Sequence, residues 1–316
     1  MEGFEMGKVK VLTARQAADL IKDGDTVTLS GFVANGIAEA LNAAAEERFL
    51  ETGHPKDLTL FWVAGTGNKD GSHADHYAHE GMVKKVIGGH FNFVPKICEM
   101  LSENKIEGYN VPQGAIAQML RDNAARKVGT ISHVGIGTFA DPRNGGGRLS
   151  EKTKEDIVKI IELEGQEQLF YPRIPLDVAF IRGTYADELG NITLEKEMAP
   201  LDATSQAMAV HNNGGLVVVQ VERVVKAGHL DPKLVKIPGI YVDAVVECPA
   251  DDPKQSQSIN CTYDPAYAGN TQVPVSSLEP KKLDAKKIIG RRAAMELKKN
   301  VVVNLGVGVP EWVSSV

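Results

Sequence analysis

The feature that most constrains the fold is the alternation of short β-branched runs with longer amphipathic stretches. The expected strands are 26–32, 57–65, 84–89, 177–183, 215–225 and 301–306, and the expected helices are 13–23, 36–52, 113–125 and 153–163. In the last helix, Thr153 and Asp156 have the spacing of a capping box. Strands that alternate with helices are joined by crossovers that make neighbouring strands parallel. We therefore predict an α/β fold with an open, largely parallel sheet flanked by helices.

Composition limits the classes of partner. The chain has 316 residues, 43% of them hydrophobic, and a formal net charge of −6. This charge gives no basic footprint for nucleic acid. The first twelve residues, "MEGFEMGKVKVL", contain no apolar signal region, and no run of 18 apolar residues follows. We expect a cytoplasmic protein with neither a nucleic-acid partner nor a membrane segment.

The order of elements predicts two related domains. Residues 249–283 are rich in proline, serine, asparagine and aspartate, which break both helix and strand periods. On either side of this stretch, residues 13–41 and 284–316 share the order helix, turn, strand, glycine turn and helix start. We predict a first domain over 1–248, a linker over 249–283, and the beginning of a similar second domain over 284–316, with its remainder absent.

Six motifs carry a family resemblance. They are "DGDTVTLSGFVANG" (23–36), "NVPQGAIAQMLR" (110–121), "GTISHVGIGTFADPRNGGG" (129–147), "EGQEQLFYPRIPLDVAFIRGTYADELGNIT" (164–193), "KIPGIYVDAVV" (236–246) and "VVNLGVGVPEWV" (302–313). Each is weak alone, but their order and spacing are specific. With them the chain resembles the family I coenzyme A transferases, within them the single-chain acetate or propionate type.

The resemblance implies a reaction. In this family CoA passes between two short-chain carboxylic acids by a ping-pong mechanism, through a glutamyl-CoA thioester. The glutamate follows the strand and turn that match "NLGVGVP", so the resemblance places the nucleophile beyond residue 316, in a missing C-terminal half. It also implies a homo-oligomer that acts on acyl-CoA and carboxylates. CoA is then a substrate, and we expect neither a permanently bound cofactor nor a metal.

Candidate site residues in the first domain lie in two turns. Gln113 follows Pro112 and precedes Gly114 at a helix start. The resemblance gives Gln113 a catalytic, substrate-contacting role and Gly114 a place beside it; the alternative is a residue that caps its own helix. Gly31, Phe32 and Gly36 lie between a strand and a helix, where backbone N–H groups and the helix N-terminus can bind substrate or CoA. The alternative here is tight turn packing alone.

A third group of candidates lies in the last expected strand and turn. Asn304 interrupts an apolar run, where a buried amide needs hydrogen-bond partners. Its position before Gly306 and Gly308 matches the family's asparagine near the reacting centre. We therefore predict that Asn304 is catalytic and that Gly306 and Gly308 contact substrate or CoA; the alternative is a polar tie between strands.

Other features of the sequence give weaker evidence about function. His73, His76 and His79 suggest a metal site, but at ~100° per residue the third is turned away from the first, so we expect a surface or interface helix. The glycine-rich loops lack both GxGxxG spacing and a Walker lysine. The acidic side chains of "ADELGNITLEKE" are expected to be mostly solvated.

Two other functional classes stay open. One is a non-catalytic protein of the same fold that binds CoA or small acids, because fold does not imply function. The other is a nucleotide-dependent oxidoreductase, which the missing dinucleotide motif disfavours. The length of the native polypeptide distinguishes the non-catalytic binding protein from the enzyme.

Overall fold

The computed structural model describes residues 7–316 and divides into two compact units, of which the first ends at Asn270 and the second comprises Thr271–Val316. The first unit thus extends past residue 248, where we predicted the first domain to end. Gln255 and Gln257, in the first half of the predicted linker, are buried.

An eight-stranded sheet forms the centre of the first unit, and all its pairings are parallel. This confirms the predicted fold class. The strand order is β1 (Lys10–Leu12), β15 (Ala244–Glu247), β12 (Leu216–Val221), β9 (Val178–Arg182), β2 (Thr26–Leu29), β3 (Leu58–Trp62), β4 (Val83–Gly88) and β5 (Glu107–Asn110).

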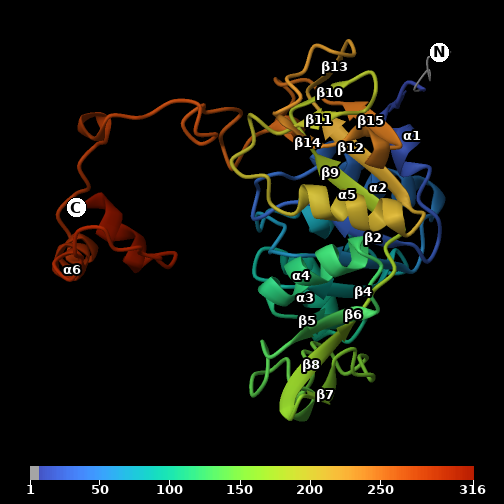
Figure 1. Cartoon of the computed structure of the whole chain (residues 1–316), viewed down its shortest axis with the longest axis horizontal. Helices are drawn as coiled ribbons and strands as arrows, with labels where there is room; N and C mark the ends of the chain where they lie inside the picture. The colour runs from blue at the N-terminus through green and yellow to red at the C-terminus, as the bar shows by residue number, and fades with distance from the viewer. Residues whose placement is uncertain (1–6) are drawn as a thin grey trace. The chain divides into compact units, whose positions relative to one another are not determined.

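Helices cover both faces of this sheet (Figure 1). One face carries α1 (Ala14–Ala18), α2 (Glu39–Thr52), η1 (His73–Tyr77) and α3 (Pro95–Ser102), and the other carries α4 (Gln113–Ala124) and α5 (Ala203–Asn212). Within β9, Val178 and Phe180 belong to the first core, whereas Ala179 and Ile181 belong to the second. This alternation makes a strand apolar on both faces, as expected for a buried parallel sheet.

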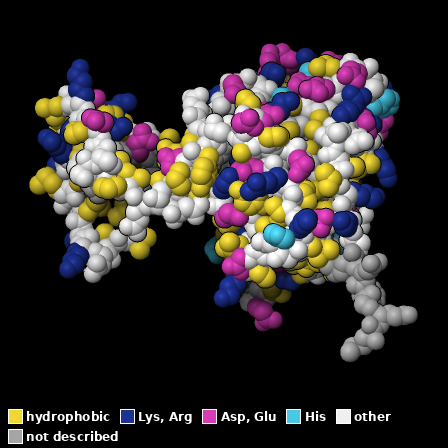
Figure 2. Space-filling view, turned by 90° about the horizontal axis from the view of Figure 1, so that it is seen from above, with side chains coloured by type: hydrophobic (Ala, Val, Ile, Leu, Met, Phe, Trp, Pro, Cys, Tyr) yellow, Lys and Arg dark blue, Asp and Glu magenta, His cyan; other side chains and the backbone are white. Residues whose placement is uncertain are grey.

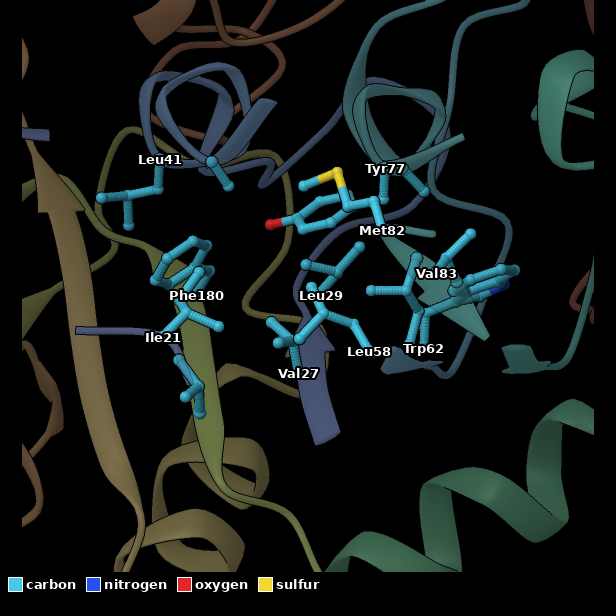
Figure 3. Packing of buried hydrophobic residues seen from close by; sticks show 14 of the residues in the cluster. Ile21, Val27, Leu29, Leu41, Leu58, Trp62, Tyr77, Met82, Val83 and Phe180 are labelled. Atoms are coloured by element: carbon cyan, nitrogen blue, oxygen red, sulfur yellow. The ribbon is translucent and has the colours of Figure 1, made fainter. Parts of the chain in front are cut away.

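The core on the α2 face is shown in Figure 3. Leu41 of α2 and Tyr77 of η1 point toward Val27, Leu29 and Leu58 of the sheet. The Tyr77 hydroxyl is satisfied within this core because it donates to Asn42 Oδ1 at 3.2 Å. Packing of this kind fixes α2 and η1 against the strands.

Two smaller sheets lie at opposite ends of the first unit (Figure 1). The four-stranded sheet has the order β13 (Arg223–Val225), β10 (Tyr185–Asp187), β11 (Ile192–Thr193) and β14 (Val235–Ile237), and the three-stranded sheet has the order β6 (Gly129–Ser132), β8 (Gln166–Pro172) and β7 (Lys159–Leu163). The predicted strand 215–225 is therefore two strands. Its chain leaves the main sheet at Glu222, whose N–H donates to the Thr184 carbonyl.

The predicted helix over 153–163 is wrong. Its second half is β7, which forms an antiparallel hairpin with β8. The turn residues Glu164 and Gly165 both have positive φ, 50° and 70°, which suits a two-residue hairpin turn. Thr153 caps no helix, because its Oγ1 accepts from the N–H of Gly108 at 2.8 Å.

The second unit contains α6 (Ala285–Ala294) and the 3₁₀ segment η6 (Val309–Ser315). The Asp284 side chain caps α6 by accepting from the Lys287 N–H at 2.9 Å. Residues 301–306 are not a strand, which corrects the prediction. A strand needs a partner for its backbone groups, and within the described second unit 301–306 pair with none.

Four further 3₁₀ turns occur at η2 (Pro142–Asn144), η3 (Gly239–Tyr241), η4 (Pro253–Gln255) and η5 (Val275–Ser277).

On the face shown in Figure 2, acidic and basic side chains are interspersed. Among residues 7–316, every helix is too short or too polar to cross a lipid bilayer.

The close packing of the loop after β4 gives a stability prediction. A Cβ at Gly89 would lie 2.2 Å from the Val63 carbonyl oxygen, whereas a Cβ at Gly114 would meet nothing within 4 Å. We expect Gly89→Ala to lower the free energy of unfolding by about 1–3 kcal/mol. Gly114→Ala, the matched control inside α4, should leave it unchanged or raise it by up to about 1 kcal/mol. Equal urea midpoints for the two variants would contradict the described packing.

Candidate functional site

The candidate site lies at the carboxyl edge of the main sheet, where the chain changes direction. The connection after β2 leads outward through β3 to β5, and the connection after β9 leads to β12 on the other side. In parallel sheets, ligands bind at such a switch point. A cavity of about 390 Å³ opens here. Its lining comprises Ala34, Ile37, Glu39, Asn68, Asp70, Ser72, His73, Arg182, Pro253, Lys254, Ser256, Ser258, Ile259 and Asn260.

The turn after β2 contains three of the predicted site residues. Gly31 has φ 119°, and a Cβ there would lie 1.9 Å from Ile37 Cδ1, so the turn requires glycine. Phe32 and Asn35 exchange backbone hydrogen bonds of 2.9 Å, which close the turn before Gly36. The side chain of Phe32 remains 42% exposed. The structure thus brings Gly31, Phe32 and Gly36 together beside the cavity.

Ser30 connects this turn to the end of β9. Its hydroxyl donates to the Gly36 carbonyl at 2.6 Å and accepts from the backbone N–H of Arg182 at 3.3 Å. The Arg182 guanidinium, itself buried, pairs with Glu197 at 3.0 Å and donates to the Ser256 carbonyl. One arginine therefore holds the turn, the 253–260 loop and a buried carboxylate in fixed positions.

Glu197 shows that the expectation of solvated acids was wrong at this position, and also at Asp187. Burial raises the pKa of Glu197, although Arg182 opposes this shift. Asp187 is satisfied locally by the N–H groups of Leu189 and Asn191. The sequence could not reveal the contact between Arg182 and Glu197, because it depends on tertiary packing, whereas the contacts of Asp187 lie within its own turn.

The N-terminus of α2 is already occupied by protein groups. Gln220 of β12 accepts from the Ala40 N–H at 2.9 Å, and Glu39 places a carboxylate in the first turn. An acidic side chain there interacts favourably with the helix dipole. The anion that we expected this helix end to attract is thus supplied by the chain itself.

Gln113 lies on the same edge, but at its far end. It follows β5, three strands from β2, which corresponds to about 14 Å at the usual strand spacing. Its side chain is exposed and makes no hydrogen bond with the described residues. The loops between are interlocked, because Val33 N–H donates to the Gly65 carbonyl and Gly89 packs on Gln113 Cβ. The edge is therefore continuous from the glycine turn to Gln113.

Asn304, Gly306 and Gly308 belong to the second unit, where all three are exposed. The expectation that Asn304 is a buried amide in a strand is not met in the described second unit.

A chain of imidazoles and carboxylates begins at the cavity. His73 Nδ1 contacts Glu39 Oε2 at 2.7 Å, and Glu39 Oε1 contacts His76 Nε2 at 2.8 Å. His76 Nδ1 then contacts Glu46 Oε2, and Glu46 Oε1 contacts His79 Nε2 at 2.6 Å. Only His73 and His76 lie in η1, and the three rings face α2 rather than solvent. In the described part of the chain, no three His, Cys, Asp or Glu side chains are placed to hold a metal ion.

The charges in this chain stabilise one another. Burial alone would raise the pKa of Glu39, but hydrogen bonds from His73 and His76 outweigh burial and lower it from 4.5 to about 2. Burial likewise disfavours a charged His76, but Glu39 and Glu46 outweigh it and raise the His76 pKa above 6.5. His76 is therefore a buried cation between two anions.

Comparisons with known proteins identify the family of this chain. The model of the family described as coenzyme A transferase matches residues 11–248, and the chain belongs to this family. It is 40% identical over 313 residues to the acetate CoA-transferase YdiF of Escherichia coli K12, which covers 98% of this chain and 58% of that protein. It is 41% identical over 307 residues to the caffeate CoA-transferase of Acetobacterium woodii, covering 97% and 58%. The chain thus spans 58% of the length of each of these curated relatives.

Solved structures give the same result. The apoenzyme of the acyl-CoA transferase YdiF from Escherichia coli O157:H7 matches with TM-score 0.88 and 39% identity, over 96% of this chain and 58% of that one. Its thioester complex with CoA matches with TM-score 0.89. Glutaconate CoA-transferase from Acidaminococcus fermentans, at 22% identity and TM-score 0.62, shares the fold.

The contacts of Ser30 give a second prediction. Ser30→Ala leaves the Gly36 carbonyl and the Arg182 N–H without their buried partner, which costs about 1–3 kcal/mol of unfolding free energy. Ser102→Ala removes a comparable hydroxyl bond from an exposed position of α3 and should change stability by less than about 0.5 kcal/mol. Denaturant unfolding of both variants measures the difference. A Ser30→Ala protein as stable as the control would show that the hydroxyl does not hold the turn.

The His76 pair gives a prediction of pH dependence. The Glu39 contribution to stability is present above about pH 4.5 and is lost as the pH falls toward 2. The His76 contribution is present below about pH 6.5 and is lost as the pH rises through its raised pKa. In Glu46→Gln, the stability deficit relative to the unmodified chain should be largest between about pH 4.5 and 6.5 and smaller at pH 9. A deficit that is constant from pH 5 to pH 9 would contradict a charged His76.

Proposed function

We propose that this chain is the N-terminal, α-subunit-like part of an enzyme that transfers CoA between short-chain carboxylic acids, of the acetyl-CoA and propionate type. The reaction proceeds through a glutamyl-CoA thioester, with the glutamate supplied from outside residues 1–316. CoA and the acids are substrates, without a permanently bound cofactor. The enzyme is a cytoplasmic homo-oligomer.

The observation that carries this proposal is the 40% identity to an acetate CoA-transferase along 98% of the chain. The site is compatible with this chemistry. A carboxylate nucleophile needs fixed N–H donors for the anionic intermediates and a neutral amide that can hold a carboxylate. In the turn, the N–H groups of Phe32, Val33 and Asn35 already donate within the protein, which leaves those of Gly31 and Gly36 for a ligand. The exposed amide of Gln113 lies on the same edge of the sheet.

The identity of the acid is a separate part of the proposal. Relatives of nearly equal identity are named for acetate and for caffeate, acids of very different size. Overall sequence identity therefore does not indicate which size of acid the acyl pocket accepts. Values of kcat/KM for acetate, propionate, lactate, butyrate and caffeate test our preference for small acids, and a marked preference for caffeate or for succinate would contradict it.

Transfer of CoA from acetyl-CoA to propionate tests the activity. The native protein, isolated at its own length, should form propionyl-CoA and acetate, whereas purified residues 1–316 should not. Turnover by 1–316 shown free of longer protein would place the nucleophile inside this chain. A native protein that binds CoA without turnover would instead support a non-catalytic binding function.

Gln113 provides a test at the level of one residue. If its amide positions the substrate carboxylate or the reactive glutamate, Gln113→Ala in the native protein lowers turnover about 10- to 100-fold, because a hydrogen bond to a charged group is lost. Gln113→Glu should be worse, since a second carboxylate repels an anionic substrate. Steady-state rates and melting temperatures are measured together.

The control for this test lies one turn further along α4. Gln118 bonds to Asp122 at 3.2 Å, away from the edge, and Gln118→Ala should turn over normally. If Gln113 only caps its helix, Gln113→Glu should impair the protein less than Gln113→Ala, because glutamate is favourable near a helix N-terminus. Normal rates with lowered melting temperatures would make Gln113 structural.

A further inference from the structure

Two apolar side chains of the first unit are held in a backbone conformation that apolar residues rarely adopt. Val33 has φ 53° and Leu201 has φ 46°, both in the left-handed region. A bulky residue in this region costs free energy, so it persists only where other contacts hold it, and such residues concentrate at functional sites. Among residues 7–316, the other non-glycine residues with positive φ are all polar: Asp57, Lys69, His73, Asn104, Arg126, Glu164, Asn260 and Asn300.

Both strained apolar residues border the glycine turn after β2. Val33 lies inside the turn, where its N–H donates to the Gly65 carbonyl at 2.6 Å and its carbonyl accepts from the Gly67 N–H at 3.0 Å. These two backbone bonds account for its conformation. Leu201 lies in the loop between β11 and α5, and among the described residues no backbone hydrogen bond holds it. Its conformation therefore depends on the contacts of its side chain and of its flanking residues.

The Leu201 side chain packs on Gly36. A Cβ at Gly36 would lie 3.3 Å from Leu201 Cδ1, which is tighter than an ordinary contact, and 3.9 Å from the Cα of Gly31. The two glycines thus lie side by side, with the leucine against one of them. On the other side, the Gly36 carbonyl accepts from the Ser30 hydroxyl at 2.6 Å. Gly36 is therefore held between a side chain from the end of β2 and one from a distant loop.

Burial alone does not explain a leucine at position 201. Leu201 is 39% exposed, and Ala199 and Pro200 before it are exposed as well. Glycine adopts positive φ without strain, and the adjacent turn uses it in this way at Gly31 and Gly36. A glycine at 201 would relieve the strain and lose little buried area. The benefit of the leucine side chain therefore lies in its contact with the turn.

Helix α5 presents Leu201 from a fixed position. The carbonyl of the next residue, Asp202, accepts from the Gln206 N–H at 2.9 Å. The Gln206 side chain donates to Thr28 Oγ1 and to the Leu29 carbonyl, both at 3.0 Å. The start of α5 is thereby tied to β2, the strand that leads into the glycine turn. Leu201 and the turn are thus attached to the same strand.

We propose that Leu201 is a positioning residue, whose side chain fixes Gly36 and thereby the direction of the free N–H groups of Gly31 and Gly36. The inference rests on the proposed transfer reaction, in which fixed N–H donors stabilise the anionic intermediates. Donors that can turn away lose this effect, because they must be reordered in every turnover. Leu201 touches no reacting atom and acts only through the turn.

Steady-state transfer of CoA by the native protein tests the catalytic part of the proposal. Leu201→Ala and Leu201→Gly should lower kcat roughly 10- to 100-fold and change the KM for acetyl-CoA by less than about twofold, because the donors act on the intermediates. Leu201→Met keeps a long apolar side chain and should recover most of the lost turnover. Leu163→Ala shortens another exposed leucine, in β7, and should turn over normally.

Melting temperatures separate a positioning role from a stabilising one. Leu201→Gly should melt at the temperature of the unmodified protein or roughly 2–4 °C higher, because glycine relieves the left-handed strain. Glu164→Gly is the matched control, since Glu164 has φ 50° in the hairpin turn between β7 and β8. It should gain stability in the same way and keep full turnover. A variant that is more stable but slower is not expected from a purely structural residue.

Hydrogen–deuterium exchange tests the contact without reference to activity. Phe32 and Asn35 exchange the backbone hydrogen bonds that close the turn. In Leu201→Gly their amides should exchange about tenfold faster, because the turn opens more often without the leucine. In Leu201→Met they should stay protected.

Three results would overturn the proposal. The first is a normal kcat in both Leu201→Ala and Leu201→Gly. The second is a melting temperature of Leu201→Gly well below that of the unmodified protein, which would make the leucine a stabilising residue. The third is unchanged exchange of the turn amides in Leu201→Gly. If the unmodified native protein transfers no CoA, the proposed reaction fails, whereas the exchange rates still decide whether Leu201 holds the turn.

Discussion

The pairing of β2 with β9 is the contact on which the rest of the first unit depends. The paired residues of these strands are 151 positions apart in the chain, yet the strands lie side by side in the centre of the sheet. Thr26 and Asp177 begin the pairing with two hydrogen bonds, of 2.8 and 2.9 Å. After β2 the chain continues to β3 on one side of the sheet, and after β9 it continues to β12 on the other side. The connections therefore diverge above this pair of strands, and the cavity lies between them at the carboxyl ends of β2 and β9.

Buried amide side chains reinforce this junction. Gln206 of α5 donates to Thr28 Oγ1 and to the Leu29 carbonyl, both at 3.0 Å. Gln220 donates to Gln255 and to the Lys254 carbonyl, which ties the cavity's loop to the end of β12. A primary amide can satisfy backbone groups from both sides without a charge, so it suits positions where loops leave a buried sheet. The same residues that complete the fold thereby shape the candidate site.

The sequence predicted the architecture well where the physical cause is local. The runs 57–65 and 177–183 form central strands because a nearly continuous apolar run can be buried on both faces of a sheet. The helix over 153–163 failed because the amphipathic pattern of 159–163 also fits an exposed hairpin strand, and the Glu164–Gly165 turn was the overlooked signal. The strand over 301–306 failed because a strand depends on partners that its own sequence does not encode.

In the candidate site, the sequence identified the turns but not the networks of side-chain hydrogen bonds and ion pairs. Gly31 and Gln113 could be recognised from glycine and proline punctuation and from family motifs. Arg182, Glu197 and the chain from His73 to His79 could not, because each is defined by partners from other elements. On a helical wheel His79 is turned away from His73, and the carboxylates that join the histidines come from α2.

If ligands bind at the carboxyl edge between β2 and β9, CoA should perturb that edge and leave the opposite edge unchanged. An NMR titration of the ¹⁵N-labelled protein with CoA, following the backbone amides of both sheet edges, measures this directly. We expect shifts in residues 31–37 and 253–260, with Asp25, Asp177 and Asp243 at the opposite edge unchanged. Shifts confined to that opposite edge would contradict it.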